Sequence, residues 1–167
     1  MIRFILSVVI VMISSTSSSF AQSEETVNVF RWRDAVHNLY VTATESGYDD
    51  SQLIKEGCTN KTFIFKAFCD PGPDRVAVYN WYNAFTWSHL CIAENEYSDS
   101  IMREIGYSQK RFQFYALTKS DQNTISVYRW LMPHGLTWIT VPEYANTDGY
   151  FKKGYRRKTY QYYAIAR

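Results

Sequence analysis

Three acidic residues, Glu45, Glu96 and Glu143, are the first candidates for chemistry, because each follows a predicted strand where a predicted helix begins. A carboxylate near a helix N-terminus stabilises the helix by about 0.3–1 kcal/mol, and this is its commoner role. The alternative is a cleft in which these carboxylates pair with Arg31 or Arg129 and present polar groups to a ligand. The sequence leaves both roles open.

Three tryptophans, Trp32, Trp81 and Trp130, could form the walls of a sugar-binding site, because a rigid indole face packs on the CH groups of a sugar. Each alternates with its neighbours along a predicted strand, however, and alternating apolar positions are usually buried. We therefore expect these residues in the central core and keep ligand binding as the alternative.

The histidines and cysteines offer little catalytic chemistry. His89 and Cys91 are alternate residues of one predicted strand, and such neighbours rarely reach the geometry of a nucleophile and its base. No H-E-x-x-H, C-x-x-C or G-x-S-x-G motif occurs in the sequence. We predict a protein without enzymatic activity, cofactor or metal, in which His89 is a ligand-binding candidate.

A basic stretch near the C-terminus, F-K-K-G-Y-R-R-K-T-Y, interleaves cations with tyrosines. Such a mixture can bind phosphates, sulfated glycans or anionic lipid headgroups. More often it is a solvated helix end, where cations complement the helix dipole. The candidate anion-binding residues are Lys152, Lys153, Arg156, Arg157 and Lys158.

Three cysteines, Cys58, Cys69 and Cys91, would favour one disulfide and one free thiol in an oxidising compartment. Of the three possible pairings we favour Cys58 with Cys69, because both flank one predicted strand. The sequon Asn60-Lys61-Thr62 predicts a glycosylated surface turn.

The N-terminus has the layout of a secretory signal peptide. One basic residue precedes the apolar run 4–13, and small residues suit a cut after Ala21. The run is too short to cross about 30 Å of hydrocarbon. We expect a secreted, extracellular protein without a transmembrane span, consisting of signal peptide 1–21 and a single domain, 22–167.

The composition limits the class of partner. The formal net charge is only +2, so no strong overall field selects a polyanion, and we predict no nucleic-acid partner. Aromatic residues make up 17% of the chain, which suits a small β-rich domain with flat recognition surfaces.

Landmark residues recur along the chain with a period of about 49. Three valines are spaced by 49 residues, and three glycines follow at steps of 49 and 48: Val29, Val78 and Val127, then Gly57, Gly106 and Gly154. Periods of this size mark units that cannot bury their apolar faces alone and pack on copies of themselves. We predict three repeats, at 27–70, 76–119 and 125–167.

Each repeat predicts the order strand, strand, short helix, strand. In the middle repeat, residues 76–81 alternate as in a strand, whereas Tyr97, Ile101 and Ile105 recur every four residues as on one helix face. Gly149 interrupts the last helix, which we expect to be only a turn or two long. The predicted fold is α+β and β-rich, with three pseudo-symmetric repeats forming one closed, trefoil- or propeller-like domain.

The phrases V-Y-N-W-Y-N, S-H-L-C-I-A-E-N-E-Y and G-Y-S-Q-K-R-F-Q-F-Y-A-L resemble an extracellular tandem-repeat module of unknown function. That module occurs on bacterial secreted glycoside hydrolases, peptidases and cell-wall proteins. Its pattern is roughly V-Y-R-L-Y-N, H-F-Y-T-T, a Glu, a Gly-aromatic pair and E-G-I-A-F-Y. The resemblance covers most of 27–165 and implies an accessory role on a wall or glycan surface.

Carried over by position, the arginine of that pattern falls on Arg31 and Arg129 but on Asn80 in the middle repeat. Its histidine matches His89 alone. Its glutamate matches the three glutamates named above, and its leucine is replaced by the three tryptophans.

Together these features predict a secreted, non-catalytic recognition module that binds an extracellular glycan or another cell-surface component, with three similar grooves giving avidity. A protein-binding effector, toxin or inhibitor is the alternative, and a small secreted hydrolase is a third possibility.

Overall fold

The computed structural model describes residues 24–135, 137–144 and 147–166, and the predicted signal peptide lies outside this part of the chain. In chain order the elements are β1 (Thr26–Asp34), β2 (Leu39–Thr44), α1 (Asp50–Lys55), β3 (Cys58–Phe68), β4 (Arg75–Asn83), β5 (Ser88–Ala93), α2 (Asp99–Glu104), β6 (Gln109–Leu117), β7 (Thr124–Leu131), β8 (Trp138–Pro142), α3 (Thr147–Lys152) and β9 (Arg156–Ile165).

The predicted order of strand, strand, short helix and strand occurs in the first unit (β1 to β3), the middle unit (β4 to β6) and the last unit (β7 to β9). The β-rich class is therefore confirmed. Each helix has six residues, including α3, which was expected to be short. Asp49 and Ser98 cap α1 and α2 with their side chains, as residues that satisfy the free backbone N–H groups of a helix start.

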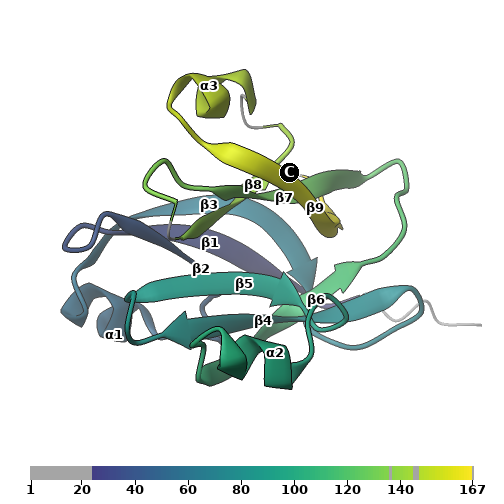
Figure 1. Ribbon diagram of the computed structural model, residues 1–167. Helices are drawn as coiled ribbons and strands as arrows, with labels where there is room; N and C mark the ends of the chain where they lie inside the picture. The colour runs from purple at the N-terminus through teal and green to yellow at the C-terminus, as the bar shows by residue number, and fades with distance from the viewer. Residues whose placement is uncertain (1–23, 136, 145–146, 167) are drawn as a thin grey trace, which may run out of the picture.

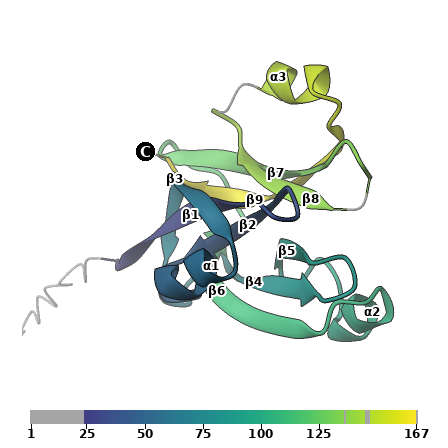
Figure 2. The same cartoon turned by 90° about the vertical axis from the view of Figure 1, so that its left-hand side faces the viewer.

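Within each unit the first strand is the central one and pairs antiparallel with the other two. Thus β1 lies between β2 and β3, β4 between β5 and β6, and β7 between β8 and β9. Figures 1 and 2 show the last unit with α3 on one side of the molecule and the middle unit with α2 on the other.

Single residue pairs join the third strands of the units. Phe68 in β3 pairs with Tyr115 in β6, β6 pairs with β9, and β3 also pairs with β9. The second strands, β2, β5 and β8, each have one hydrogen-bonded neighbour, so the antiparallel sheet is open at these three edges.

The central core contains one large aromatic ring from each unit. Phe65, Phe114 and Tyr162 meet edge to face, with ring centroids 5.7–6.3 Å apart. All three are at most 1% exposed, as are the valines that mark the 49-residue period. Edge-to-face pairs at this distance stabilise a core beyond the area that they bury.

The three strand tryptophans are buried, but not in this central core. Trp32, Trp81 and Trp130 are 5%, 3% and 0% exposed, and each belongs to a separate peripheral cluster in its own unit. Leu53 of α1 and Met102 of α2 complete two of these clusters. The tryptophans are thus buried, as expected, but in peripheral clusters and not in the predicted central core. A buried indole has no face open to a sugar.

The disulfide prediction is wrong. Cys58 and Cys69 lie at opposite ends of the eleven-residue strand β3, and all three cysteines are free thiols. A strand rises about 3.3 Å per residue, which places the two residues roughly 35 Å apart. A disulfide requires Cα atoms within about 7 Å. Two cysteines at opposite ends of one extended strand are therefore too far apart to form a disulfide.

Gly106 follows α2 in the left-handed conformation that favours glycine at a helix C-terminus, with φ +93°. A Cβ atom there would lie 2.8 Å from the Asn83 side-chain nitrogen, which donates to the carbonyl of Ile105. Gly135 has φ +74°, but nothing lies within 4 Å of its Cβ position.

Gly135→Ala should therefore lower the free energy of unfolding by about 1 kcal/mol, through backbone strain alone. Gly106→Ala should lower it by at least about 1 kcal/mol more, because Asn83 must also move. Urea unfolding monitored by circular dichroism measures both, and equal losses would contradict the predicted contact.

Candidate functional site

The predicted acidic residues do not gather in one cleft. Glu45 receives the Lys61 ammonium at 2.6 Å, and Glu143 receives that of Lys158 at 3.4 Å. The middle-unit counterpart is Glu94, 49 residues from each, rather than Glu96; its carboxylate lies 3.2 Å from Lys110. The glutamates at these equivalent positions are thus exposed partners of lysines.

These lysines form one arrangement in all three units. Their ammonium groups lie 3.8–4.1 Å from the ring centroids of aromatic residues in the middle of the first strands: Lys61 over Phe30, Lys110 over Tyr79, and Lys158 over Tyr128. A cation over a ring face is stabilised by about 0.5–1 kcal/mol at an exposed site. Lys158 is therefore engaged within its own unit, and Lys61 and Lys110 were not singled out by sequence reasoning.

The two predicted arginines join neighbouring units instead of lining an open cleft. The buried Arg129 pairs with Glu96 at 2.5 Å, donates to the Tyr97 hydroxyl at 3.1 Å, and lies 4.7 Å from the Trp138 ring. Burial raises the pKa of Glu96, and the Arg129 charge opposes that shift. Arg31 likewise donates to the hydroxyl of Tyr150 in the last unit.

The junction between the first and middle units differs at two positions. Asn80 stands where the other units have Arg31 and Arg129, and Cys58 stands where they have the buried Tyr107 and Tyr155. Both replacements are shorter side chains. The volume that an arginine and a tyrosine ring fill at the other junctions is therefore available here.

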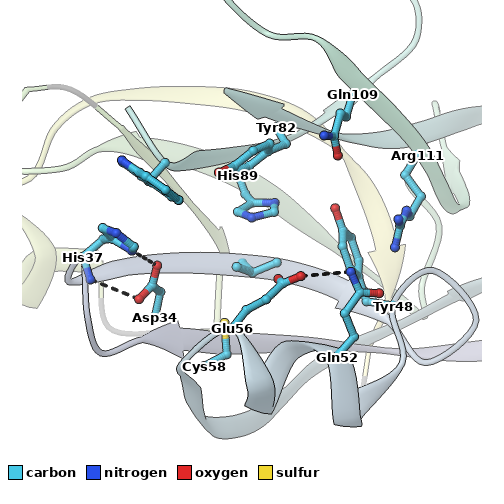
Figure 3. A pocket seen from close by; sticks show the side chains of 12 residues that line it. Asp34, His37, Tyr48, Gln52, Glu56, Cys58, Tyr82, His89, Gln109 and Arg111 are labelled. Atoms are coloured by element: carbon cyan, nitrogen blue, oxygen red, sulfur yellow. Dashed lines mark hydrogen bonds and ion pairs between the residues drawn. The ribbon is translucent and has the colours of Figure 1, made fainter. Parts of the chain in front are cut away.

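A pocket of about 340 Å³ occupies this junction (Figure 3). Residues of β1, β2, α1 and the start of β3 form one side, and residues of the β4–β5 hairpin and β6 form the other. The lining residues are Asp34, His37, Val41, Tyr48, Gln52, Glu56, Cys58, Tyr82, Trp87, His89, Gln109 and Arg111.

Trp87 forms an exposed aromatic wall of this pocket. Its side chain is 53% exposed, and its ring lies parallel to that of His37 at 4.9 Å. Its φ is +57°, a left-handed conformation that is unusual for a bulky residue. The same hairpin position in the first unit is Asn38, also at φ +57°, which tolerates this conformation. Such strain concentrates at functional sites.

Sequence reasoning missed Trp87 because it considered only the tryptophans on strands. A signal was available: a tryptophan occupies a hairpin turn where the preceding unit has asparagine.

The floor of the pocket is uncharged at neutral pH. Burial lowers the pKa of His89 from its ordinary 6.5 to about 4, and the Arg111 charge adds to this shift while Asp34 opposes it. Burial also raises the pKa of Tyr48 to about 12 and that of Cys58 to about 11. The floor therefore presents a neutral imidazole, a phenol and a thiol.

The lining also contains charged groups, of which Arg111 and Glu56 are exposed and Asp34 is buried. The Arg111 guanidinium lies 4.2 Å from the Tyr48 ring and donates to the carbonyl of Gly47 at 3.2 Å. Glu56 accepts from Gln52 at 2.9 Å, and Asp34 contacts the His37 ring at 2.7 Å. Figure 3 shows Asp34 and His37 at one side of His89, and Tyr48, Gln52 and Arg111 at the other.

His89 is the one predicted ligand-binding residue that lines this pocket. It does not pair with Cys91, which lies in the central core and contacts Tyr162. Burial raises the pKa of the Cys91 thiol to about 12, so the thiolate form is absent at neutral pH. These two residues do not form a nucleophile and base.

The cations of the basic stretch have different roles. Arg156 donates to the carbonyls of Phe151 and Tyr155, which fits the predicted role at a helix end. Lys152, Lys153 and Arg157 are exposed. Asn60 of the predicted sequon is also exposed, at φ +53° in β3.

Within the described ranges, no group of three or more histidine, cysteine or acidic side chains is placed to hold a metal. No helix in the same part of the chain combines the length and apolar character needed to span a membrane.

The sequence profile of a domain of unknown function, DUF5648, matches residues 40–165. The chain belongs to this family. The matched region contains every pocket-lining residue except Asp34 and His37. No curated protein and no solved structure matches the chain.

The buried His89 makes folding depend on pH. Above pH 6.5 the imidazole is neutral in both states, whereas between pH 6.5 and 4 the unfolded chain binds a proton that the folded protein excludes. The free energy of unfolding therefore falls as the pH falls, and the loss due to His89 amounts to about 2–3 kcal/mol by pH 4.5.

His89→Gln should reduce the difference in unfolding free energy between pH 7 and pH 4.5 by that amount, as measured by urea unfolding at each pH. His134→Gln, at an exposed turn, is the control and should retain the wild-type difference. An unchanged difference in His89→Gln would contradict the buried neutral imidazole.

Proposed function

We propose that the protein is a secreted, non-catalytic recognition module that binds a saccharide in the pocket between the first and middle units. The observation that carries this proposal is Trp87, an exposed indole held at positive φ above a neutral polar floor. Aromatic walls with a few placed polar groups are typical of small-molecule sites. An indole face also suits the CH face of a sugar ring.

The dimensions of the pocket support a small cyclic ligand. Its volume of about 340 Å³ is near the lower end of the usual range for ligand pockets, about 300–1,000 Å³. Part of this space corresponds to the tyrosine rings of the other two units, which Cys58 does not fill. A slot that matches a six-membered ring suits a single sugar or the end of a glycan chain.

The polar lining supports an uncharged ligand rather than a polyanion. Gln52 and Gln109 supply amides, and the carboxylates of Asp34 and Glu56 outnumber the single Arg111. Saccharide hydroxyls can donate to carboxylates and accept from amides. The resemblance to repeats on bacterial secreted glycoside hydrolases and cell-wall proteins points to the same ligand class.

We also propose that the three units are copies of one repeat, arranged about a pseudo-threefold axis as one closed domain. Equivalent residue pairs link β3 to β6, β6 to β9 and β9 to β3, which supports a cyclic order. The three central rings and the three lysine–aromatic contacts support it further. Only the first junction lacks both the arginine and the tyrosine, so this proposal favours one principal site over three equal grooves.

Trp87→Asn should weaken saccharide binding without loss of stability, because asparagine tolerates the positive φ and is already found at position 38. A glycan array followed by isothermal titration calorimetry measures binding, and thermal unfolding measures stability. We expect a loss of affinity of roughly five- to tenfold, since packing on one aromatic side chain contributes on the order of 1–1.5 kcal/mol.

Phe85→Ala is the matched control, because Phe85 lies on the same hairpin and is 93% exposed but does not line the pocket. It should bind the saccharide like the wild type. No glycan bound above background by the wild-type protein at high concentration would remove the proposal.

Cys58→Tyr should fill the pocket with the residue found in the other two units, and so abolish binding while the fold is retained. Cys58→Ala leaves the space open and should bind normally. Tight binding by a folded Cys58→Tyr protein would place the saccharide elsewhere.

A protein-binding effector is the second candidate, and one observation favours it. Three large apolar side chains that stand within two residues of pocket-lining positions in the sequence, Val36, Ile54 and Phe85, are 61–93% exposed. Scattered exposed apolar residues are common, but a patch of them marks a contact surface. A cell-surface protein retained by Trp87→Asn and lost by Phe85→Ala would favour this candidate over the saccharide.

A further inference from the structure

The hydrogen bonds of Asn80 determine which nitrogen of His89 carries the proton. The Asn80 side-chain nitrogen donates to the backbone carbonyl of Thr42 at 3.0 Å, so the Asn80 side-chain oxygen faces His89. His89 Nδ1 lies 2.9 Å from that oxygen. A carbonyl oxygen can only accept, and Nδ1 must therefore carry the proton.

This arrangement fixes the tautomer of His89. With the proton on Nδ1, a neutral imidazole has a lone pair on Nε2 and can only accept there. Nε2 has no hydrogen-bond partner among the described residues, and the ring lies at the centre of the pocket (Figure 3). Burial keeps the ring neutral.

Tyr48 adds a second acceptor beside the first. Its hydroxyl donates to the same Asn80 oxygen at 3.4 Å, which leaves the phenol oxygen free to accept. The Asp34 and Glu56 carboxylates also accept, whereas the donors of Arg111 and Gln109 lie on exposed residues at the rim. The floor consequently offers a ligand's carbonyl or carboxylate only a weak donor, the Cys58 S–H group.

We propose that the pocket selects its ligand by a hydrogen-bond donor, a free hydroxyl or amino group of a saccharide that seats on His89 Nε2, and that Asn80 is the positioning residue that fixes this preference. The inference rests on the proposed saccharide function and specifies which sugars the site accepts. Sugars whose buried end is blocked by a methyl ether or carries a carboxylate are excluded, because an acceptor opposite Nε2 leaves both groups without a partner.

The ligand test uses methyl glycosides of glucose, galactose, mannose and N-acetylglucosamine, titrated by calorimetry. The strongest binder is then compared with its deoxy and deoxyfluoro derivatives at each hydroxyl. Fluorine retains some acceptor character but cannot donate. We expect one position at which both derivatives bind about tenfold more weakly, as expected when a buried acceptor is left unpaired.

His89→Phe keeps an aromatic ring but lacks Nε2, and should bind the parent sugar and its fluorinated derivative equally. A fluorinated sugar that binds the wild type like the parent at every position, while a deoxy sugar does not, overturns the inference and leaves the saccharide function standing. Failure of every glycoside to bind overturns the proposed function, and the inference with it.

Nitrogen-15 NMR of histidine-labelled protein tests the tautomer without any ligand. We expect His89 to show a protonated Nδ1 and an unprotonated Nε2 at pH 7. Asn80→Asp places a carboxylate beside Nδ1 and should convert His89 to the imidazolium, whereas Asn80→Ala should release the tautomer preference. A wild-type Nε2 that carries the proton, or a tautomer unaffected by either Asn80 variant, overturns the inference even if a saccharide binds.

Discussion

The edge-to-face contact of Phe65, Phe114 and Tyr162 is the interaction on which the rest of the structure depends. No unit can bury its own ring, because each ring is covered by the other two. A three-stranded antiparallel unit with one short helix has too little apolar surface to fold alone. The shared core therefore fixes the three units together, and every junction between them follows from that constraint.

The junctions show how one backbone arrangement supports different chemistry. Where an arginine is present, it contacts a tyrosine hydroxyl of the neighbouring unit and leaves no room for a ligand. Arg129 is also paired with the partly buried carboxylate of Glu96, and removing that partner would leave the buried guanidinium without its counter-charge. At the junction between the first and middle units, Asn80 and Cys58 replace the arginine and the tyrosine, so these contacts are absent there. The pocket is the space that remains, and its polar floor is built from the same positions.

Local patterns allowed much of the fold to be predicted. Alternation predicted the strands, and a short helix was correctly predicted between the second and third strands of each repeat. The tryptophans were expected in the core, and alternation along a strand predicted their burial. It could not distinguish the central core from a peripheral cluster, because both lie beneath one face of the same strand.

The candidate site was much less predictable, because it is made by residues from different units. His89 was identified, but its partner Asn80 was noted only as a departure from a pattern. Trp87 lies in a turn, where periodicity carries no information. Glu96 was grouped with Glu45 and Glu143, although the constant spacing belongs to Glu94. Glu94, an exposed partner of Lys110, and Glu96, the partly buried partner of Arg129, lie only two residues apart.

The most direct measurement is a crystal structure of the protein soaked with a methyl glycoside that it binds in solution. We predict that the sugar ring lies against Trp87 between the first and middle units, with one hydroxyl within hydrogen-bond distance of His89 Nε2. A sugar bound at another surface, with Trp87 in an extended conformation and its ring closing the space beside Cys58, would contradict the central claim.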